Sequence, residues 1–114
     1  MTAKEYLFQI KKFDTQIKNK TFEKKQIEAL GENAGAIKEE IKDLRRKRQK
    51  VIADMEKLNE AEYDVLHKHY VQGKTFKEIA ALRDSSYSLI TTIHGAACRK
   101  ISGMINGTSP KETK

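Results

Sequence analysis

Apolar residues recur along the first third of the chain at the three- and four-residue spacing of one helix face. That face carries Tyr6, Ile10, Phe13, Ile17, Ile27 and Leu30. Between its two halves the same face carries Lys20 and Lys24. Because the aliphatic stems of lysine can pass a partner helix while the charges reach water, the pattern predicts one continuous helix with a weak middle.

A turn and a second helix follow. Gly31 and Gly35 bracket Glu32-Asn33-Ala34, a composition that ends a helix and lets the chain reverse. A second apolar seam with heptad spacing then consists of Ile37, Ile41, Leu44, Val51, Met55 and Leu58, broken only at Arg48. Two single-seam helices joined by a short turn bury each other's apolar faces, so residues 1–58 are expected to form an antiparallel, coiled-coil-like hairpin.

Two further helix starts are marked by residues that can bond the free backbone amides of a first turn. Asn59 is followed three residues later by Glu62, and Thr75 by Glu78, so each pair can form a capping box. Gly73 is a helix stop between them. The first of these helices carries Tyr63, Leu66 and Tyr70, and the second, of about two turns, carries Phe76, Ile79, Ala80 and Leu82 as expected core residues.

A last helix is predicted over residues of about 86–102. Asp84, Ser85 and Ser86 are successive cap candidates, and its inner face carries Ile90, Ile93, Ala97 and Ile101. Three helices within residues 59–103, with a short middle one, have the spacing of a helix-turn-helix. The predicted class is therefore all-α, a hairpin followed by a three-helix unit, with residues 104–114 expected to be a disordered tail.

The order of these residues carries a family resemblance. The matching positions are Tyr63 before Val65-Leu66, Tyr70 before Gly73, the run Thr75 to Ala80, Leu82, and then Ile90, Ile93, Ala97, Arg99-Lys100 and Ile101. This segment resembles region 4 of bacterial RNA polymerase sigma factors and the related small transcription regulators of phages and mobile elements of Gram-positive hosts.

The resemblance implies that the last helix lies in the DNA major groove. Carried over by position, the base readers are Tyr87, Ser88, Thr91 and Thr92, with Ser86 near the phosphates and Arg99 as a further DNA contact. Sigma factors usually place Arg, Glu or Gln at several of these positions, and this chain does not. Side chains of Ser, Thr and Tyr make single hydrogen bonds or touch thymine methyl groups, so weak discrimination between bases is expected.

Charge adds a second indication of an acidic partner. The 114 residues hold 23 Lys or Arg against 16 Asp or Glu, a net charge of +7, and nucleic acid is the commonest acidic partner of a small basic chain. The densest run is Arg45, Arg46, Lys47 and Arg48, expected to meet phosphates. An equally weighted alternative is ordinary exposed ion pairing with Glu39, Glu40 and Asp43.

Catalytic and metal-binding patterns are weak. His67 and His69 point to different faces of one helix. His94 and Cys98 share a face, but no second pair has zinc-ligand spacing. With one cysteine and no apolar run of membrane-spanning length, the expectations are a cytoplasmic chain with no cofactor, no metal, no membrane partner and no enzymatic activity.

Three functions follow as alternatives. The first is a DNA-binding transcription regulator of a phage or mobile genetic element, with double-stranded DNA as partner. The second is a protein-interaction module that binds RNA polymerase or a phage packaging (small terminase) component and redirects it. The third is a structural coiled coil that oligomerises through residues 1–58. A homodimer is the commonest default for such a hairpin.

Overall fold

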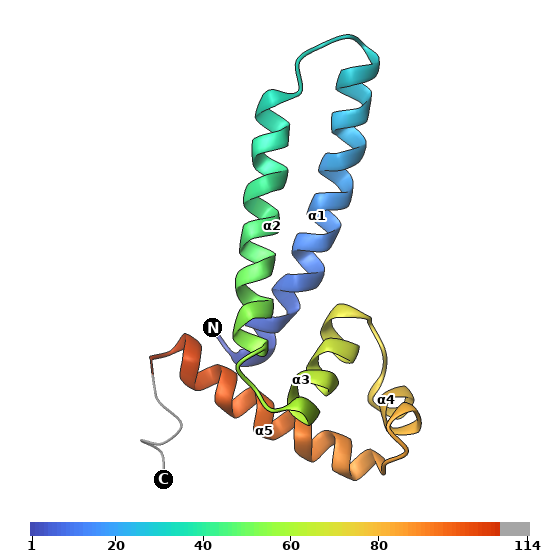
Figure 1. The fold of residues 1–114 in the computed structure, drawn as a ribbon, viewed down its shortest axis with the longest axis vertical. Coiled ribbons are helices and arrows are strands. Elements are labelled where there is room, and N and C mark those ends of the chain that lie inside the picture. The colour runs from blue at the N-terminus through green and yellow to red at the C-terminus, as the bar shows by residue number, and fades with distance from the viewer. Residues whose placement is uncertain (108–114) are drawn as a thin grey trace.

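The computed structural model describes residues 1–107, which contain helices and turns and no strand. Two antiparallel helices, α1 (Ala3–Ala29) and α2 (Gly35–Met55), form a hairpin that stands on a smaller helical body (Figure 1). The body consists of α3 (Glu60–Leu66), η1 (His67–Val71), α4 (Phe76–Leu82) and α5 (Tyr87–Ile105). The predicted all-α class, a helical hairpin followed by further helices, is confirmed.

The hairpin buries apolar residues at its foot and, in a smaller group that includes Ile37 and Ile41, near its tip. Tyr6 and Ile10 are buried near the foot, whereas Leu30 is 75% exposed, so its predicted place in the seam is wrong. Gly31, with φ +75°, ends the first helix in a conformation that favours glycine. Near the tip, Lys20 Nζ lies 3.5 Å from Glu40 Oε1 across the hairpin. An ion pair thus adds to the apolar contacts near the tip.

The predicted break in the second seam is filled by an ion pair. Arg48 Nε donates to Asp14 Oδ1 across the hairpin at 2.5 Å, and the Arg48 side chain is 28% exposed. Helix α1 is continuous through its weak middle, as predicted. A partly buried pair of this kind fixes the register of two helices more than it adds to their stability.

Both predicted capping boxes of the helix-turn-helix are present. Asn59 and Glu62 exchange side-chain to backbone hydrogen bonds at the start of α3, and Thr75 and Glu78 do the same at α4. Of the three cap candidates before the last helix, Ser86 is the cap, and its Oγ accepts from the Leu89 amide at 3.0 Å. The ends of these helices are thus satisfied locally.

The wide helical turn η1 was not predicted. Its i→i+5 geometry ends with the Gln72 amide, which donates to the His67 carbonyl at 3.0 Å, and in the loop the Lys74 amide donates to the Lys68 carbonyl at 2.9 Å. His69 Nδ1 donates to the Lys74 carbonyl at 2.7 Å. These bonds satisfy the backbone between α3 and α4, including the bend at Gly73, whose φ is +75°.

The hairpin and the C-terminal unit share one hydrophobic core. Leu7 and Ile10 of α1 and Met55 of α2 are fully buried with Leu66 and Ile101 of the body. A second, smaller cluster of Val65, Ile79, Ala80 and Ile90 holds α4 against α5. The predicted division at residues 58 and 59 therefore separates segments of the chain but not two independent cores.

The predicted end of the last helix at Gly103 is wrong. Helix α5 continues to Ile105, and Met104 and Ile105 pack against the shared core. A glycine inside a helix costs about 1 kcal/mol relative to alanine, which the burial of two large side chains can offset. Of the expected tail, residues 104–105 are helical and residues 108–114 lie outside the described residues. No helix within residues 1–107 combines the length and the hydrophobicity that a membrane span requires.

Candidate nucleic-acid interface

Helices α4 and α5 form the two-helix element whose second member is the predicted recognition helix. The turn between them contains Asp84, with φ +53°, a left-handed conformation that Asp tolerates better than most residues. Helix α5 buries Ile90, His94 and Ala97 against the body. Because of this burial, the opposite side of its first turns faces solvent. Figure 1 shows these turns on the body, at the end of the molecule away from the hairpin tip.

The solvent-facing side of α5 carries a line of polar residues, here called the polar strip: Ser88, Thr92 and Arg99. All three are exposed, and their spacings of four and seven residues place them on one helix face. The neighbouring Thr91 is partly exposed, and Ser86 and Tyr87 are exposed at the start of the helix. The structure thus brings Ser88, Thr92 and Arg99 together on one side of α5, with Thr91 beside them. Tyr87 lies about 100° around the helix from Ser88, on the side of Phe76.

Hydrogen bonds within the helix restrict what the two threonines can do. Thr91 Oγ1 and Thr92 Oγ1 both donate to the Ser88 carbonyl, at 2.8 and 3.0 Å. A hydroxyl has one proton to donate and two lone pairs, so both oxygens remain acceptors. The threonines are therefore suited to accept from an exocyclic amino group of adenine or cytosine, and their methyl groups to touch thymine.

Gly95 leaves the middle of this face open. It lies inside α5, and a Cβ built there would meet only Arg99 Nη1, at 3.7 Å. The Arg99 side chain therefore lies back along the helix toward Gly95. With no side chain at this position, another molecule can approach the backbone of α5 closely.

Cations beside the strip differ in their partners. Arg83 Nη1 is 2.6 Å from Asp64 Oδ2, and Lys100 Nζ is 2.9 Å from Glu62 Oε2. Lys74, Lys77 and Arg99, in contrast, form no ion pair with any carboxylate in residues 1–107. These three side chains are the free positive charges of the C-terminal unit.

Apolar side chains are also exposed near the α4–α5 turn. Leu82, Tyr87 and Leu89 are 59%, 58% and 47% exposed, so the predicted core position of Leu82 is wrong. The Tyr87 ring meets Phe76 edge-on, with centroids 6.4 Å apart. This contact holds the ring at the edge of the body.

The basic run on α2 is not brought together with the polar strip. Arg46 and Lys47 both contact Asp43, at 3.0 and 3.2 Å, and Arg48 pairs with Asp14. Arg45 forms no ion pair within the part of the chain that the structure describes. The run lies on the hairpin, whereas α5 lies in the body beneath it (Figure 1). A duplex seated on the first turns of α5 would contact other cations first.

A buried histidine, His94, lies behind the polar strip; the sequence placed it on one face with Cys98 but did not predict its contact with Tyr70. The Tyr70 hydroxyl donates to His94 Nε2 at 2.8 Å, and Cys98 Sγ lies 3.5 Å from the same nitrogen. Burial, together with the charges of His69 and Lys4, lowers the pKa of His94 to about 4. The imidazole is neutral at pH 7 and serves as a core hydrogen-bond acceptor. Within residues 1–107, no three potential metal ligands gather in one place.

The His94 pKa predicts a pH dependence of stability. Between pH 6.5 and about 4 the unfolded chain binds a proton at this residue that the folded chain does not. The free energy of unfolding should therefore fall by up to about 3 kcal/mol as the pH is lowered through that window. Urea denaturation at a series of pH values measures it. In the variant His94→Gln the free energy of unfolding should change less with pH across this range. An equally steep fall in that variant would rule out His94 as the source of the pH dependence.

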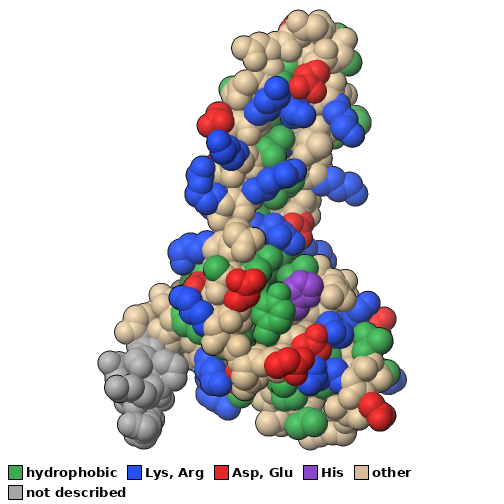
Figure 2. Space-filling model, viewed as in Figure 1, with side chains coloured by type: hydrophobic (Ala, Val, Ile, Leu, Met, Phe, Trp, Pro, Cys, Tyr) green, Lys and Arg blue, Asp and Glu red, His purple; other side chains and the backbone are tan. Residues whose placement is uncertain are grey.

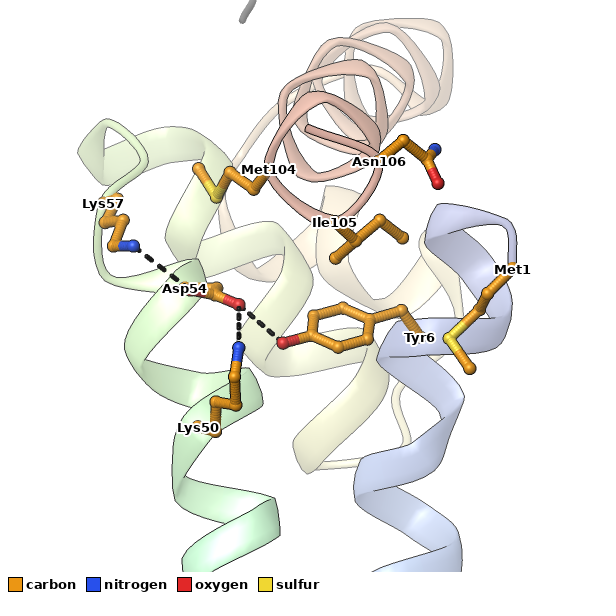
Figure 3. Close-up of a pocket in the computed structure, with 8 residues that line it drawn as sticks. All are labelled: Met1, Tyr6, Lys50, Asp54, Lys57, Met104, Ile105 and Asn106. Atoms are coloured by element: carbon orange, nitrogen blue, oxygen red, sulfur yellow. Dashed lines mark hydrogen bonds and ion pairs between the residues drawn. The ribbon is translucent and has the colours of Figure 1, made fainter. Parts of the chain in front are cut away.

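The foot of the hairpin holds a cavity of about 600 Å³, bordered by α1, α2 and the end of α5 (Figure 3). Asp54 Oδ2 accepts from the Tyr6 hydroxyl at 2.5 Å, and its carboxylate pairs with Lys50 and Lys57 at 3.6 and 3.2 Å. Burial tends to raise the pKa of Asp54, but these bonds outweigh it and hold the pKa below its usual range. Asp54 is thereby an ionised structural group that joins α1 to α2.

Comparison with known proteins gives one match. No curated protein and no solved structure matches the chain. A protein-family model described as "Glycosyl transferase 4-like" matches residues 7–105, which include most of the hairpin and all of α3 to α5. By this match the chain belongs to the glycosyl transferase 4-like family.

Proposed function

We propose that this chain is a DNA-binding transcription regulator of a phage or mobile genetic element, and that α5 enters the major groove. The observation that carries the proposal is the polar strip. Ser88, Thr92 and Arg99 share the solvent-facing side of the second helix of a short-turn helix pair. The resemblance to sigma factor region 4 assigns DNA reading to this helix, and two capping boxes and a buried core support it rigidly.

In this proposal, phosphates and bases are contacted by different groups. Lys74 and Lys77, near the start of α4, and Arg99 neutralise phosphates beside the groove. Ser86 and the positive end of the α5 dipole favour a further phosphate at the helix start. The hydroxyl oxygens of Thr91 and Thr92 accept from base amino groups, with Gly95 allowing close approach of the helix. Such contacts discriminate modestly, so much of the affinity comes from phosphates.

We infer that the chain acts by binding and not by catalysis. The family description names a transferase, and enzymes that cleave the related glycosidic bond by hydrolysis use a pair of carboxylates that face the sugar. The carboxylate of the largest cavity described, Asp54, is bonded to Tyr6 and paired with two lysines. This arrangement supports a structural role for the group, and we do not extend glycosyl transfer to this chain.

The exposed apolar residues favour a second candidate. Leu82, Tyr87 and Leu89 lie at the α4–α5 turn and its flanks, where a purely phosphate-binding surface would carry polar residues. They support docking on a protein, such as RNA polymerase or a phage packaging component. The two functions differ in whether duplex DNA alone is bound with sequence preference.

A salt titration tests the proposed phosphate contacts. Replacing Lys74, Lys77 and Arg99 by alanine should weaken binding to every duplex and reduce the slope of log affinity against log salt by about 3, since each phosphate contact contributes about 0.9. Fluorescence anisotropy with a labelled random duplex at several salt concentrations measures the slope.

The matched control removes cations from the hairpin. The triple variant Arg45→Ala, Arg46→Ala and Lys47→Ala removes the same number of charges and should reduce the slope by less than about 0.5, because these residues lie in the middle of α2 whereas α5 packs against the foot of the hairpin. The reverse result, with a large change in the hairpin variant and none in the C-terminal variant, would move the DNA contact to α2 and overturn the proposed orientation.

A further inference from the structure

The outer face of α1 carries a second repeat of residues, separate from the seam that packs on α2. Lys4, Lys11, Lys18 and Lys25 follow one another at intervals of seven residues, about 10.5 Å along a helix. Phe8 and Phe22 are interleaved with them, fourteen residues or about 21 Å apart. At 100° per residue all six fall within an arc of about 100°, whose centre lies about 140° around the helix from the seam that packs on α2.

This face is open and has one sign of charge. Phe8 and Phe22 are 49% and 64% exposed, and the four lysines are exposed. None of the four forms an ion pair within residues 1–107, whereas the inner Lys20 and Lys24 do. Figure 2 shows Lys and Arg side chains outnumbering acidic ones on the side of the hairpin in view.

The acidic residues of α1 are turned away from the repeat or engaged elsewhere. Glu5 and Glu23 lie about 60° around the helix from Phe8 and about 100° from Phe22. Glu5 bonds the Thr2 amide in the helix cap, and Asp14 pairs with Arg48 across the hairpin. The positive potential along the outer face is therefore not neutralised by its own helix.

The lower end of the face is hollowed. An apolar hollow of about 410 Å³ is lined by Phe8, Lys11, Lys12, Thr15 and Gln16. A second, of about 270 Å³, lies between Phe8 and η1. The Phe8 ring stands edge-on against Tyr70 at 5.1 Å between centroids, so the body holds it in place as a fixed wall of both hollows.

We propose that the outer face of α1 binds an acidic amphipathic helix of a partner protein. The partner's carboxylates, one heptad apart, lie against the four lysines, and its apolar side chains cover Phe8 and Phe22 and fill the hollows. The result is a three-helix assembly in which α1 carries two seams, one for α2 and one for the partner. This inference stands apart from the proposed DNA contact, which lies on α5.

The charge pattern selects this occupant over two others. A second copy of the chain docked through the same face would place lysines against lysines, which is unfavourable. Duplex DNA would satisfy the charges but offers no apolar surface to two phenylalanines about 21 Å apart on a straight helix. A helix with acidic heptads has the same repeat as the lysines and supplies both kinds of contact.

The probe is a fluorescein-labelled synthetic helix of four heptads, with leucine and glutamate placed to face Phe8, Phe22 and the lysines. A peptide of identical composition with the heptad order scrambled controls for plain charge attraction. Anisotropy titrations should show the ordered peptide binding at least about tenfold more tightly, the equivalent of about 1.4 kcal/mol. Equal binding of the two peptides, or no binding of either, would overturn the proposal.

Variants locate the contact. Lys11→Glu with Lys18→Glu should weaken binding of the ordered peptide by about tenfold or more, whereas Lys38→Glu with Lys42→Glu, an equal charge change on α2, should leave it within about twofold. Phe22→Ser, at an exposed position, should also weaken it, and helical circular dichroism confirms that each variant is folded. Loss of DNA binding but not of peptide binding in the Lys11 and Lys18 variant would assign the face to nucleic acid.

Discussion

Replacing Leu66 by alanine should lower the free energy of unfolding by about 2–5 kcal/mol, the range for a large aliphatic residue removed from a tight core. Leu66 is fully buried where α1, α2 and α5 meet. Because the hairpin foot and the C-terminal unit share that core, the two segments should unfold together in the variant. Urea denaturation followed by circular dichroism, with hydrogen exchange to resolve the segments, measures both effects.

The control for Leu66 is the same substitution at an exposed leucine. Leu82→Ala removes a side chain that is 59% exposed and should change the free energy of unfolding by less than about 0.5 kcal/mol. If Leu66→Ala melted α3 to α5 while amides in α2 kept their protection, the hairpin would be an independent unit and the shared core would carry little energy.

Introducing carboxylates on the polar strip should abolish DNA binding. In the double variant Ser88→Glu with Thr92→Glu, two negative charges would face the groove and its phosphates. Like charges placed against each other at an interface cost several kcal/mol, so the pair should reduce affinity for duplex DNA by about a hundredfold or more. A gel mobility-shift titration with a random duplex pool measures this loss.

The matched control places the same charges elsewhere. Gln26→Glu with Gln49→Glu alters two exposed residues of the hairpin and changes the net charge equally. The affinity of this control variant for duplex DNA should fall by less than about threefold, because only the overall electrostatic potential of the protein changes. Equal losses in both double variants would mean that net charge, and not the position of α5, governs binding.

Local signals in the sequence predicted the helix ends well. The boxes at Asn59 and Thr75 depend on residues three positions apart, and the structure contains both. The turn at Gly31 and the continuity of α1 were likewise predictable from spacing and composition. In each case a short stretch of chain determines its own geometry, so neighbours in space change little.

Features that depend on packing between segments were not predictable. Nothing near Leu7 in the sequence indicates that it is fully buried in the shared core. The wide turn η1 and the burial of His94 against Tyr70 likewise require the arrangement of α1, η1 and α5. Helix α5 passes Gly103 because Ile105 finds a place in the same core, a tertiary effect that outweighs local propensity.

The candidate site divides in the same way. Helical periodicity places Ser88 and Thr92 away from the apolar stripe of α5, and the structure places them on the solvent side. Where the basic run Arg45 to Arg48 lies relative to that face depends on the orientation of the hairpin on the body (Figure 1). No local sequence pattern specifies this orientation. Leu82 is a similar case. It lies on the predicted apolar stripe of α4, but its side chain is exposed because burial also depends on packing between segments.

The central claim is that the exposed face of α5 reads bases. Selection of bound sequences from a random duplex pool, carried out with the natural chain and with a triple alanine variant of Tyr87, Thr91 and Thr92, tests it most directly. One enriched motif is expected for the natural chain, whereas binding by the variant should remain salt-dependent but lose the motif. The same motif from both proteins, or no enrichment with the natural chain, would contradict the claim.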